Sequence, residues 1–144
     1  VNELGKPYHK EIAGKQTVNF NISHSGEFIL EGFAVGMDIG VDVQEMAGCP
    51  DYREIAGNFY TAEEAEDVIN EGPELFFQYW AAKEAYVKAI GIGLGRGMDF
   101  FSVRNGEITE KGRKGQGWHL YPVKIEGYAA YVAAHKKGDK SNEL

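Results

Sequence analysis

Two polar side chains in one short segment could bind a metal ion. Residues 38–44 read Asp-Ile-Gly-Val-Asp-Val-Gln, and strand alternation places 38, 40, 42 and 44 on one face and the β-branched residues on the other. Asp42 and Gln44 would then offer a carboxylate and an amide oxygen to a hard cation such as Mg²⁺, with Gly40 leaving room beside them. The alternative is an exposed strand aspartate whose apolar neighbours lie in the core.

A helical stripe combines an acid, a base and large aromatic rings. At 100° per residue, Glu84 and Lys88 lie on the same side of a helix as Phe77 and Trp80. A carboxylate beside buried rings is costly unless a cation or hydrogen bonds compensate it, which favours a chemical role. The alternative is an ordinary surface pair at i,i+4, which stabilises a helix by only ~0.2–0.5 kcal/mol.

Ser23 and His24 are neighbours within residues 20–26. Adjacent residues of an extended chain point to opposite faces, so His24 is poorly placed to act as the base for a Ser23 nucleophile. Contact of the pair with a phosphate in a turn fits better. The glycine-rich run at 91–97 departs from the dinucleotide-binding pattern, because Arg96 and Met98 stand where the third glycine is needed and the run follows a helix. We expect a turn there.

Helix signals lie in the middle of the chain. Thr61 and Glu64 form a capping box that opens a helix ending near Ile69, and Gly72-Pro73 separates it from a longer helix at 74–90. Gly91 ends the longer helix.

Strand signals lie on both sides of the helices. Alternation of Val18, Phe20 and Ile22 with Asn19 and Asn21 predicts a half-buried strand. Asparagine followed by glycine at 105–106 is the pair that a two-residue hairpin turn favours. The expected strands are 17–23, 28–35 and 38–43, forming a meander, and then 118–124 and 128–134. Helices grouped between antiparallel hairpins predict an α+β fold with helices packed on the sheet.

Length and composition limit the class of protein. The chain has 144 residues, 43% of them hydrophobic, and a formal net charge of −7, with ten acidic residues and one basic residue between 42 and 74. We expect one domain at 1–135, a polar tail at 136–144, and a solvated helical face for most of the acidic residues. No membrane span or signal sequence is evident, so we expect a soluble, cytoplasmic protein without a nucleic-acid or membrane partner. The single Cys49 excludes an internal disulfide.

In combination, these segments resemble one family. Phe-Asn-Ile-Ser-His-Ser-Gly at 20–26, Ile-Gly-Val-Asp-Val at 39–43 and Trp-Ala-Ala-Lys-Glu-Ala-Tyr-Val-Lys at 80–88 are similar in order and spacing to motifs of the Sfp-type 4′-phosphopantetheinyl transferases. Gly-Lys-Pro at 5–7 resembles an earlier motif of that family. The resemblance implies one half of a pseudo-dimer of two similar α+β units, so an N-terminal half would be missing or replaced by self-association.

The resemblance also implies an activity, namely Mg²⁺-dependent transfer of the 4′-phosphopantetheine arm of coenzyme A to a serine of an acyl or peptidyl carrier protein, with release of 3′,5′-ADP. It implies metal ligation by Asp42, Gln44 and Glu84, with Glu84 as base and Lys88 at the leaving phosphate. The residues implied at coenzyme A are Lys6, Pro7, Ser23, His24 and Lys83.

One departure from the family concerns the metal. Many relatives have a third acid where this chain has Gln44, so the metal site would consist of two carboxylates and an amide or water. Two other functions stay open at this point. A non-catalytic coenzyme A or nucleotide binding module would tolerate loss of Glu84, and a protein-interaction domain would need neither metal nor coenzyme A.

Overall fold

The computed structural model describes residues 17–93 and 97–136. The predicted contacts of Lys6 and Pro7, and residues 137–144 of the expected tail, lie outside this part of the chain. Lys136, which we expected in the tail, is the last residue of a strand. The helices are α1 (Tyr52–Phe59), α2 (Ala62–Glu71) and α3 (Pro73–Ile90). The strands are β1 (Val18–Ser25), β2 (Phe28–Val35), β3 (Met37–Glu45), β4 (Thr109–Glu110), β5 (Arg113–Lys114), β6 (Trp118–Pro122) and β7 (Tyr128–Lys136).

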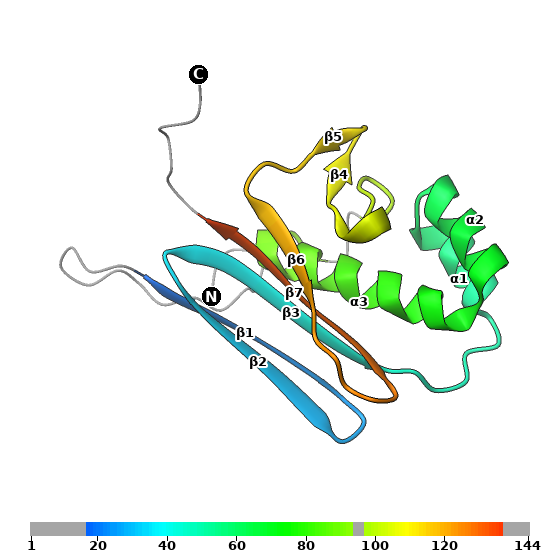
Figure 1. Cartoon of the computed structure of the whole chain (residues 1–144), viewed down its shortest axis with the longest axis horizontal. Helices are drawn as coiled ribbons and strands as arrows, with labels where there is room; N and C mark the ends of the chain where they lie inside the picture. Colours follow the sequence, from blue (N-terminus) through cyan, green and yellow to red (C-terminus); the bar gives the residue numbers. More distant parts are fainter. Residues whose placement is uncertain (1–16, 94–96, 137–144) are drawn as a thin grey trace.

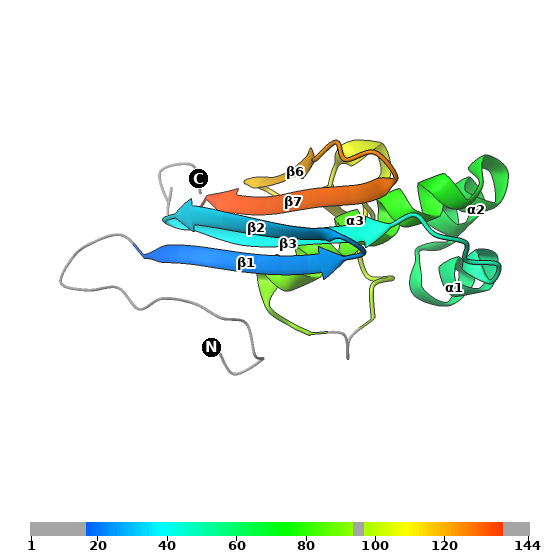
Figure 2. The same cartoon turned by 90° about the horizontal axis from the view of Figure 1, so that it is seen from below.

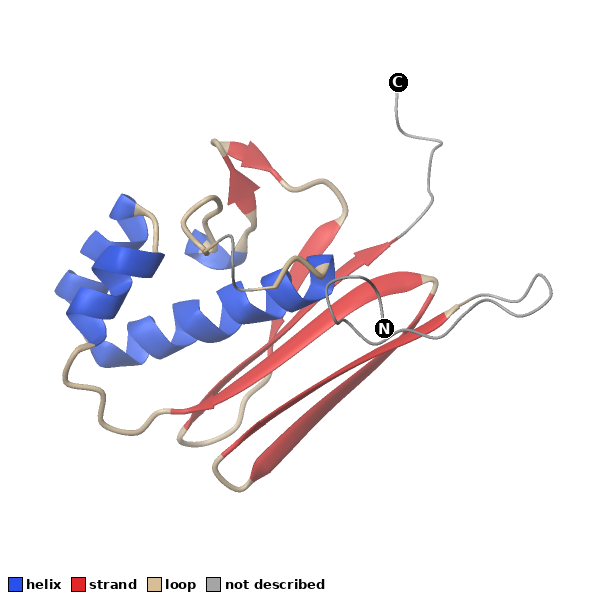
Figure 3. Ribbon diagram, turned by 180° about the vertical axis from the view of Figure 1, so that it is seen from behind, coloured by secondary structure: helices blue, strands red, loops and turns tan. Residues whose placement is uncertain are grey.

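The architecture is α+β, as predicted. A three-stranded antiparallel sheet has the order β3-β7-β6, β1 and β2 form a separate hairpin, and β4 and β5 form a small third sheet. α3 lies across one face of the three-stranded sheet, and α1 and α2 gather at its N-terminal end (Figure 1). Viewed from behind, α3 lies in front of the layer of long strands, and the short β4 and β5 lie apart from that layer (Figure 3).

The capping signals position the helices as expected. Thr61 and Glu64 make the reciprocal capping box of α2, Pro73 occupies the first turn of α3, and Gly91 ends α3 in the left-handed conformation at φ 73°. α1 was not predicted, since it spans only eight residues and its N-cap Asp51 makes no side-chain cap. Tertiary packing holds it, because Ala56 is fully buried and the Tyr52 ring lies 6.0 Å from that of Phe76.

The prediction of a three-stranded meander is wrong at its third strand. β1 and β2 pair as an antiparallel hairpin, but β3 leaves them after Gly36 and pairs along its whole length with β7. β1 instead runs parallel to β3 along its free edge (Figure 2). The bonds between them come from side chains of β1: Asn21 accepts from Val41 N at 2.9 Å, Ser23 from Val43 N at 3.1 Å and Ser25 from Glu45 N at 2.8 Å.

This attachment reverses the usual orientation of a half-buried strand, in which the apolar face is turned inward. Asn19, Asn21 and Ser23 are buried against β3, whereas the alternating apolar side chains of the hairpin point outward. Ile29 is 69% exposed and Phe33 66% exposed. The remaining exposed members of this outer face are Val18, Ile22 and Val35. We call these five residues the outer hairpin face.

The turn predicted at 105–106 is present but does not join two long strands. Asn105 and Gly106 have positive φ of 59° and 72° within a short 3-10 turn, and the connection between β4 and β5 is made by Lys111 and Gly112 instead. Glu126 and Gly127 lie between β6 and β7 as expected. No helix within residues 17–93 and 97–136 has the length and apolar character that crossing a membrane requires.

Candidate active site

α3 meets β3 at a point where only glycine fits. A Cβ on Gly40 would collide with the carbonyl oxygen of Ala85 and lie 2.5 Å from Ala89 N. The expected free space beside Gly40 is therefore filled by the helix. This close approach brings Asp42, two residues further along the same face of β3, near Glu84 and Lys88 of α3.

Asp42 is buried, which excludes the exposed strand aspartate considered above. Its side chain lies in the interface with 5% of its surface exposed, Oδ1 accepts from Ser23 Oγ at 3.2 Å, and Oδ2 accepts from Gln44 Nε2 at 2.9 Å. Burial raises the pKa of Asp42 to about 6, and the hydrogen bonds and Lys88 only partly oppose this. The Asp42 to Gln44 bond confirms that both residues lie on one face of the strand.

Glu84 lies close enough to Asp42 for the two carboxylates to interact. Burial, followed by repulsion from Asp42, raises the pKa of Glu84 to about 7, and the Lys88 ammonium opposes the shift. Among the described residues, no ion pair joins Glu84 to Lys88, so the ordinary surface pair is not what forms. Neighbouring carboxylates whose pKa values are raised by burial are typical of functional sites.

Lys88 connects β1 and β3, which are not joined by backbone hydrogen bonds of a sheet. Its ammonium donates to the carbonyl oxygen of Ile22 in β1 at 2.8 Å and to that of Val41 in β3 at 2.7 Å. Burial lowers the pKa of Lys88, while Asp42 and Glu84 raise it. Lys88 thus places a positive charge beside Asp42 and Glu84 and also ties the hairpin to β3.

Ser23 and His24 point in different directions, as alternation predicts. Ser23 is buried beside Asp42, whereas His24 is exposed on the opposite side of β1. The Ser23 hydroxyl is already used twice, since it donates to Asp42 and accepts from Val43 N. Contacts of Ser23 and His24 with coenzyme A stay predictions.

Lys83 lies far from where a ligand could reach it. Its side chain is fully buried and its ammonium forms an ion pair with Glu64 at 2.6 Å. It also donates to the carbonyl oxygen of Phe101 at 2.5 Å. The geometry gives no support to contact between Lys83 and coenzyme A, and we leave it out of the site proposed below. Glu64, the ion-pair partner of Lys83, was assigned from the sequence only to the capping box, so the buried ion pair was not predicted.

The donor set at Asp42, Gln44 and Glu84 is chemically suited to a hard cation. All three offer oxygen atoms, and burial raises the pKa of both carboxylates, a shift that a bound cation would oppose. Within the described ranges, no three side chains of His, Cys, Asp or Glu gather into a metal-binding group. A cation here would therefore rest on two acids, an amide and water.

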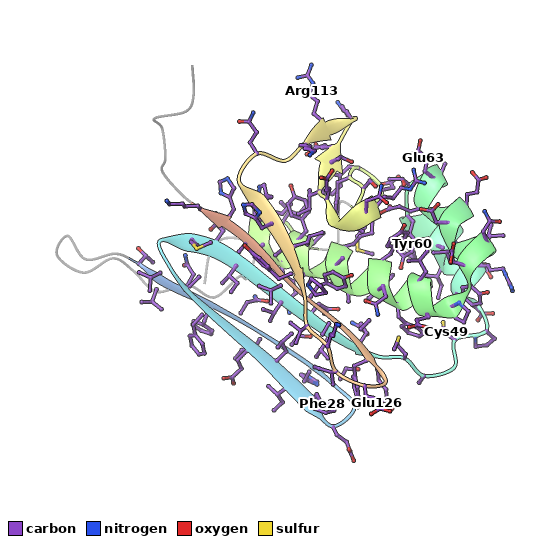
Figure 4. All side chains as sticks on the ribbon, viewed as in Figure 1. Phe28, Cys49, Tyr60, Glu63, Arg113 and Glu126 are labelled. Atoms are coloured by element: carbon purple, nitrogen blue, oxygen red, sulfur yellow. The ribbon has the colours of Figure 1, made fainter. Side chains whose placement is uncertain are left out.

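Two apolar pockets lie beside these residues and were not predicted. A cavity of 230 Å³ is lined by Gln44, Ile55, Phe76, Phe77 and Trp80. A larger one of 540 Å³ shares Phe77 and lies under the segment between β3 and α1, where Cys49 is found (Figure 4). The Phe77 and Trp80 stripe next to Glu84 was the only sequence signal for them.

Comparison with known proteins identifies relatives. The model of the 4′-phosphopantetheinyl transferase superfamily matches residues 38–134. A 4′-phosphopantetheinyl transferase of Bacillus subtilis is 36% identical over 108 residues, covering 72% of this chain and 46% of that protein. The 4′-phosphopantetheinyl transferase Sfp of Bacillus subtilis strain 168 is 34% identical with the same coverage. The human L-aminoadipate-semialdehyde dehydrogenase-phosphopantetheinyl transferase is 31% identical, covering 85% of this chain and 47% of that protein. The chain spans about half the length of these curated relatives.

Proposed function

Because this chain belongs to the 4′-phosphopantetheinyl transferase superfamily, we propose that it carries the reaction centre for moving the phosphopantetheine arm of coenzyme A to a serine of a carrier protein. The serine oxygen would attack the phosphorus that bears the pantetheine, the diphosphate P–O bond would break, and 3′,5′-ADP would leave. The observation that supports this most is the buried Asp42 carboxylate beside the half-buried Glu84 carboxylate, whose pKa it helps to raise.

Asp42, Glu84 and Gln44 would hold Mg²⁺ with water completing its shell, because these are the oxygen donors of the site. When bound, Mg²⁺ neutralises charge on diphosphate oxygens. Glu84 would serve as the base that takes the serine proton, directly or through a water that it orients. Asp42, held by Ser23 and Gln44, would keep its carboxylate directed at the metal.

Lys88 would contribute positive charge next to the reacting phosphates. Its contacts with Ile22 and Val41 fix the ammonium in place. The proposed interaction with the leaving phosphate would use the direction that these carbonyl bonds leave open.

Mass spectrometry of an apo carrier protein, incubated with this chain, coenzyme A and Mg²⁺, tests the proposal. The carrier should gain one phosphopantetheine. The gain should be lost when EDTA is added and when the Glu84→Gln variant replaces the wild-type chain. A thermal shift with coenzyme A but no transfer would favour the binding module, and no shift would favour the interaction domain.

A further inference from the structure

A buried ion pair lies on a different side of α3 from the one that Glu84 presents to Asp42. Glu64 and Lys83 are both completely excluded from solvent, and the Lys83 ammonium lies 2.6 Å from Glu64 Oε1. Desolvation makes such pairs costly, and uncharged residues of similar size often serve stability equally well. Stability alone therefore does not explain why two charged residues are buried here, and we consider another role for them.

The pair joins three segments. Glu64 Oε1 also accepts from Thr61 N at 3.1 Å, and Oε2 accepts from Val103 N at 2.8 Å. Lys83 donates to the carbonyl oxygen of Phe101, and its ammonium lies 4.2 Å from the centre of the Phe101 ring. The start of α2, the middle of α3 and residues 101–103 thus meet at one point. Figure 4 labels Tyr60 and Glu63 at this end of the molecule, where α2 lies against α3.

Lys83 and Glu84 are consecutive on α3, so their side chains leave the helix about 100° apart. Lys83 is directed to α2 and Glu84 to β3. Rotation of α3 by roughly 10° would shift a carboxylate about 6 Å from the helix axis by about 1 Å, and such a displacement can cost ~10²-fold in rate. Contacts that hold Lys83 in place therefore also set the position of Glu84.

We propose that Glu64 and Lys83 are positioning residues, whose buried pair fixes the rotation of α3 and so aims Glu84 at Asp42. This inference rests on the proposed function. Lys83 would then act on the reaction through the position of Glu84 and not, as expected from the sequence, by contact with coenzyme A.

The Glu64→Gln/Lys83→Met double variant removes both charges while keeping similar side-chain volumes and an acceptor for Val103 N. Its melting temperature should stay within a few degrees of wild type. The kcat for transfer should fall roughly 10- to 100-fold with little change in the KM for coenzyme A. Binding of Mg²⁺, followed through the ¹³C signal of the Glu84 carboxyl, should weaken. If the double variant does not unfold cooperatively, the Glu64→Gln/Lys83→Gln variant, which also leaves no unpaired buried charge, decides with the same measurements.

Arg104→Met is the matched control. Arg104 forms partly exposed ion pairs with Glu63 and Asp67 of α2. These pairs also hold α2 to the segment after α3, but they do not involve Lys83. Its loss should leave kcat and the Glu84 signal unchanged. A folded double variant with wild-type kcat and wild-type Mg²⁺ response would overturn the proposal. If the wild-type chain itself shows no transfer, the proposed function fails, whereas the response of Glu84 to Mg²⁺ still tests the positioning.

Discussion

The carboxylate of Asp42 is expected to destabilise the folded chain at neutral pH when no cation is present. Burial raises its pKa from 3.8 to about 6, and each pKa unit corresponds to about 1.4 kcal/mol, which gives about 3 kcal/mol. Between these pH values the folded state keeps a proton that the unfolded state has released. The free energy of unfolding therefore falls as pH rises from about 4 to 6, and the full penalty remains above that range.

The Asp42→Asn variant removes this penalty at pH 8 but sacrifices part of the local bonding. Asp42 accepts hydrogen bonds on both oxygens, from Ser23 and Gln44, and an amide retains one acceptor, so about 1 kcal/mol is lost. The net stabilisation at pH 8 should be about 2 kcal/mol, or roughly 6–8 °C in melting temperature. At pH 4 the gain should vanish, because Asp42 is then protonated in the folded wild type.

Urea and thermal unfolding of both forms between pH 4 and 8, in EDTA, measure this difference. Asp51→Asn changes an exposed carboxylate that makes no side-chain cap and serves as the control, with no expected change in the pH dependence. If Asp42→Asn were less stable than wild type by the same amount at every pH, the buried carboxylate would be favourable as it stands, and the reasoning would be refuted.

Three further predictions concern the site and the hairpin. Glu84→Gln should lower transfer at least ~10²-fold with an unchanged fold, and activity within a few-fold of wild type would return Glu84 to a surface role. Gln44→Glu should reach half-maximal transfer at lower Mg²⁺ but melt at lower temperature in EDTA through repulsion with Asp42, whereas an unchanged Mg²⁺ midpoint would remove Gln44 from the metal. Light scattering should show concentration-dependent association of the chain through the outer hairpin face, reduced by Phe33→Glu; equal masses for both forms at all concentrations would contradict this.

Local signals predicted α2, α3 and part of the site. The Thr61 and Glu64 capping box, Gly91 and the alternation of Asp42 with Gln44 all depend on residues within a few positions of one another. The motif resemblance then placed Asp42, Glu84 and Lys88 together, and the structure brings them into one electrostatic group.

The failures are all non-local. Apolar alternation in β1 gives the two faces but cannot tell that Asn21 and Ser23 would serve the edge of β3, which is what turns Ile22 outward. Nor can it select β7, which lies far along the chain, as the partner of β3. Lys83 has the polarity of a surface or ligand-binding residue, and only the arrival of Glu64 from 19 positions earlier shows that it is interior.

The side-chain bonds along β3 make its amide protons reporters of two separate motions. The amides of Val41, Val43 and Glu45 donate to side chains of the hairpin, so lifting the hairpin would expose them to deuterium while the sheet stays intact. The amides between them point to β7 and become exposed only when the sheet itself opens. The amides at alternate positions of β3 would therefore exchange with deuterium at different rates. The ratio of the two rates measures how much more often the hairpin, with Ser23, moves away from Asp42 than the sheet opens.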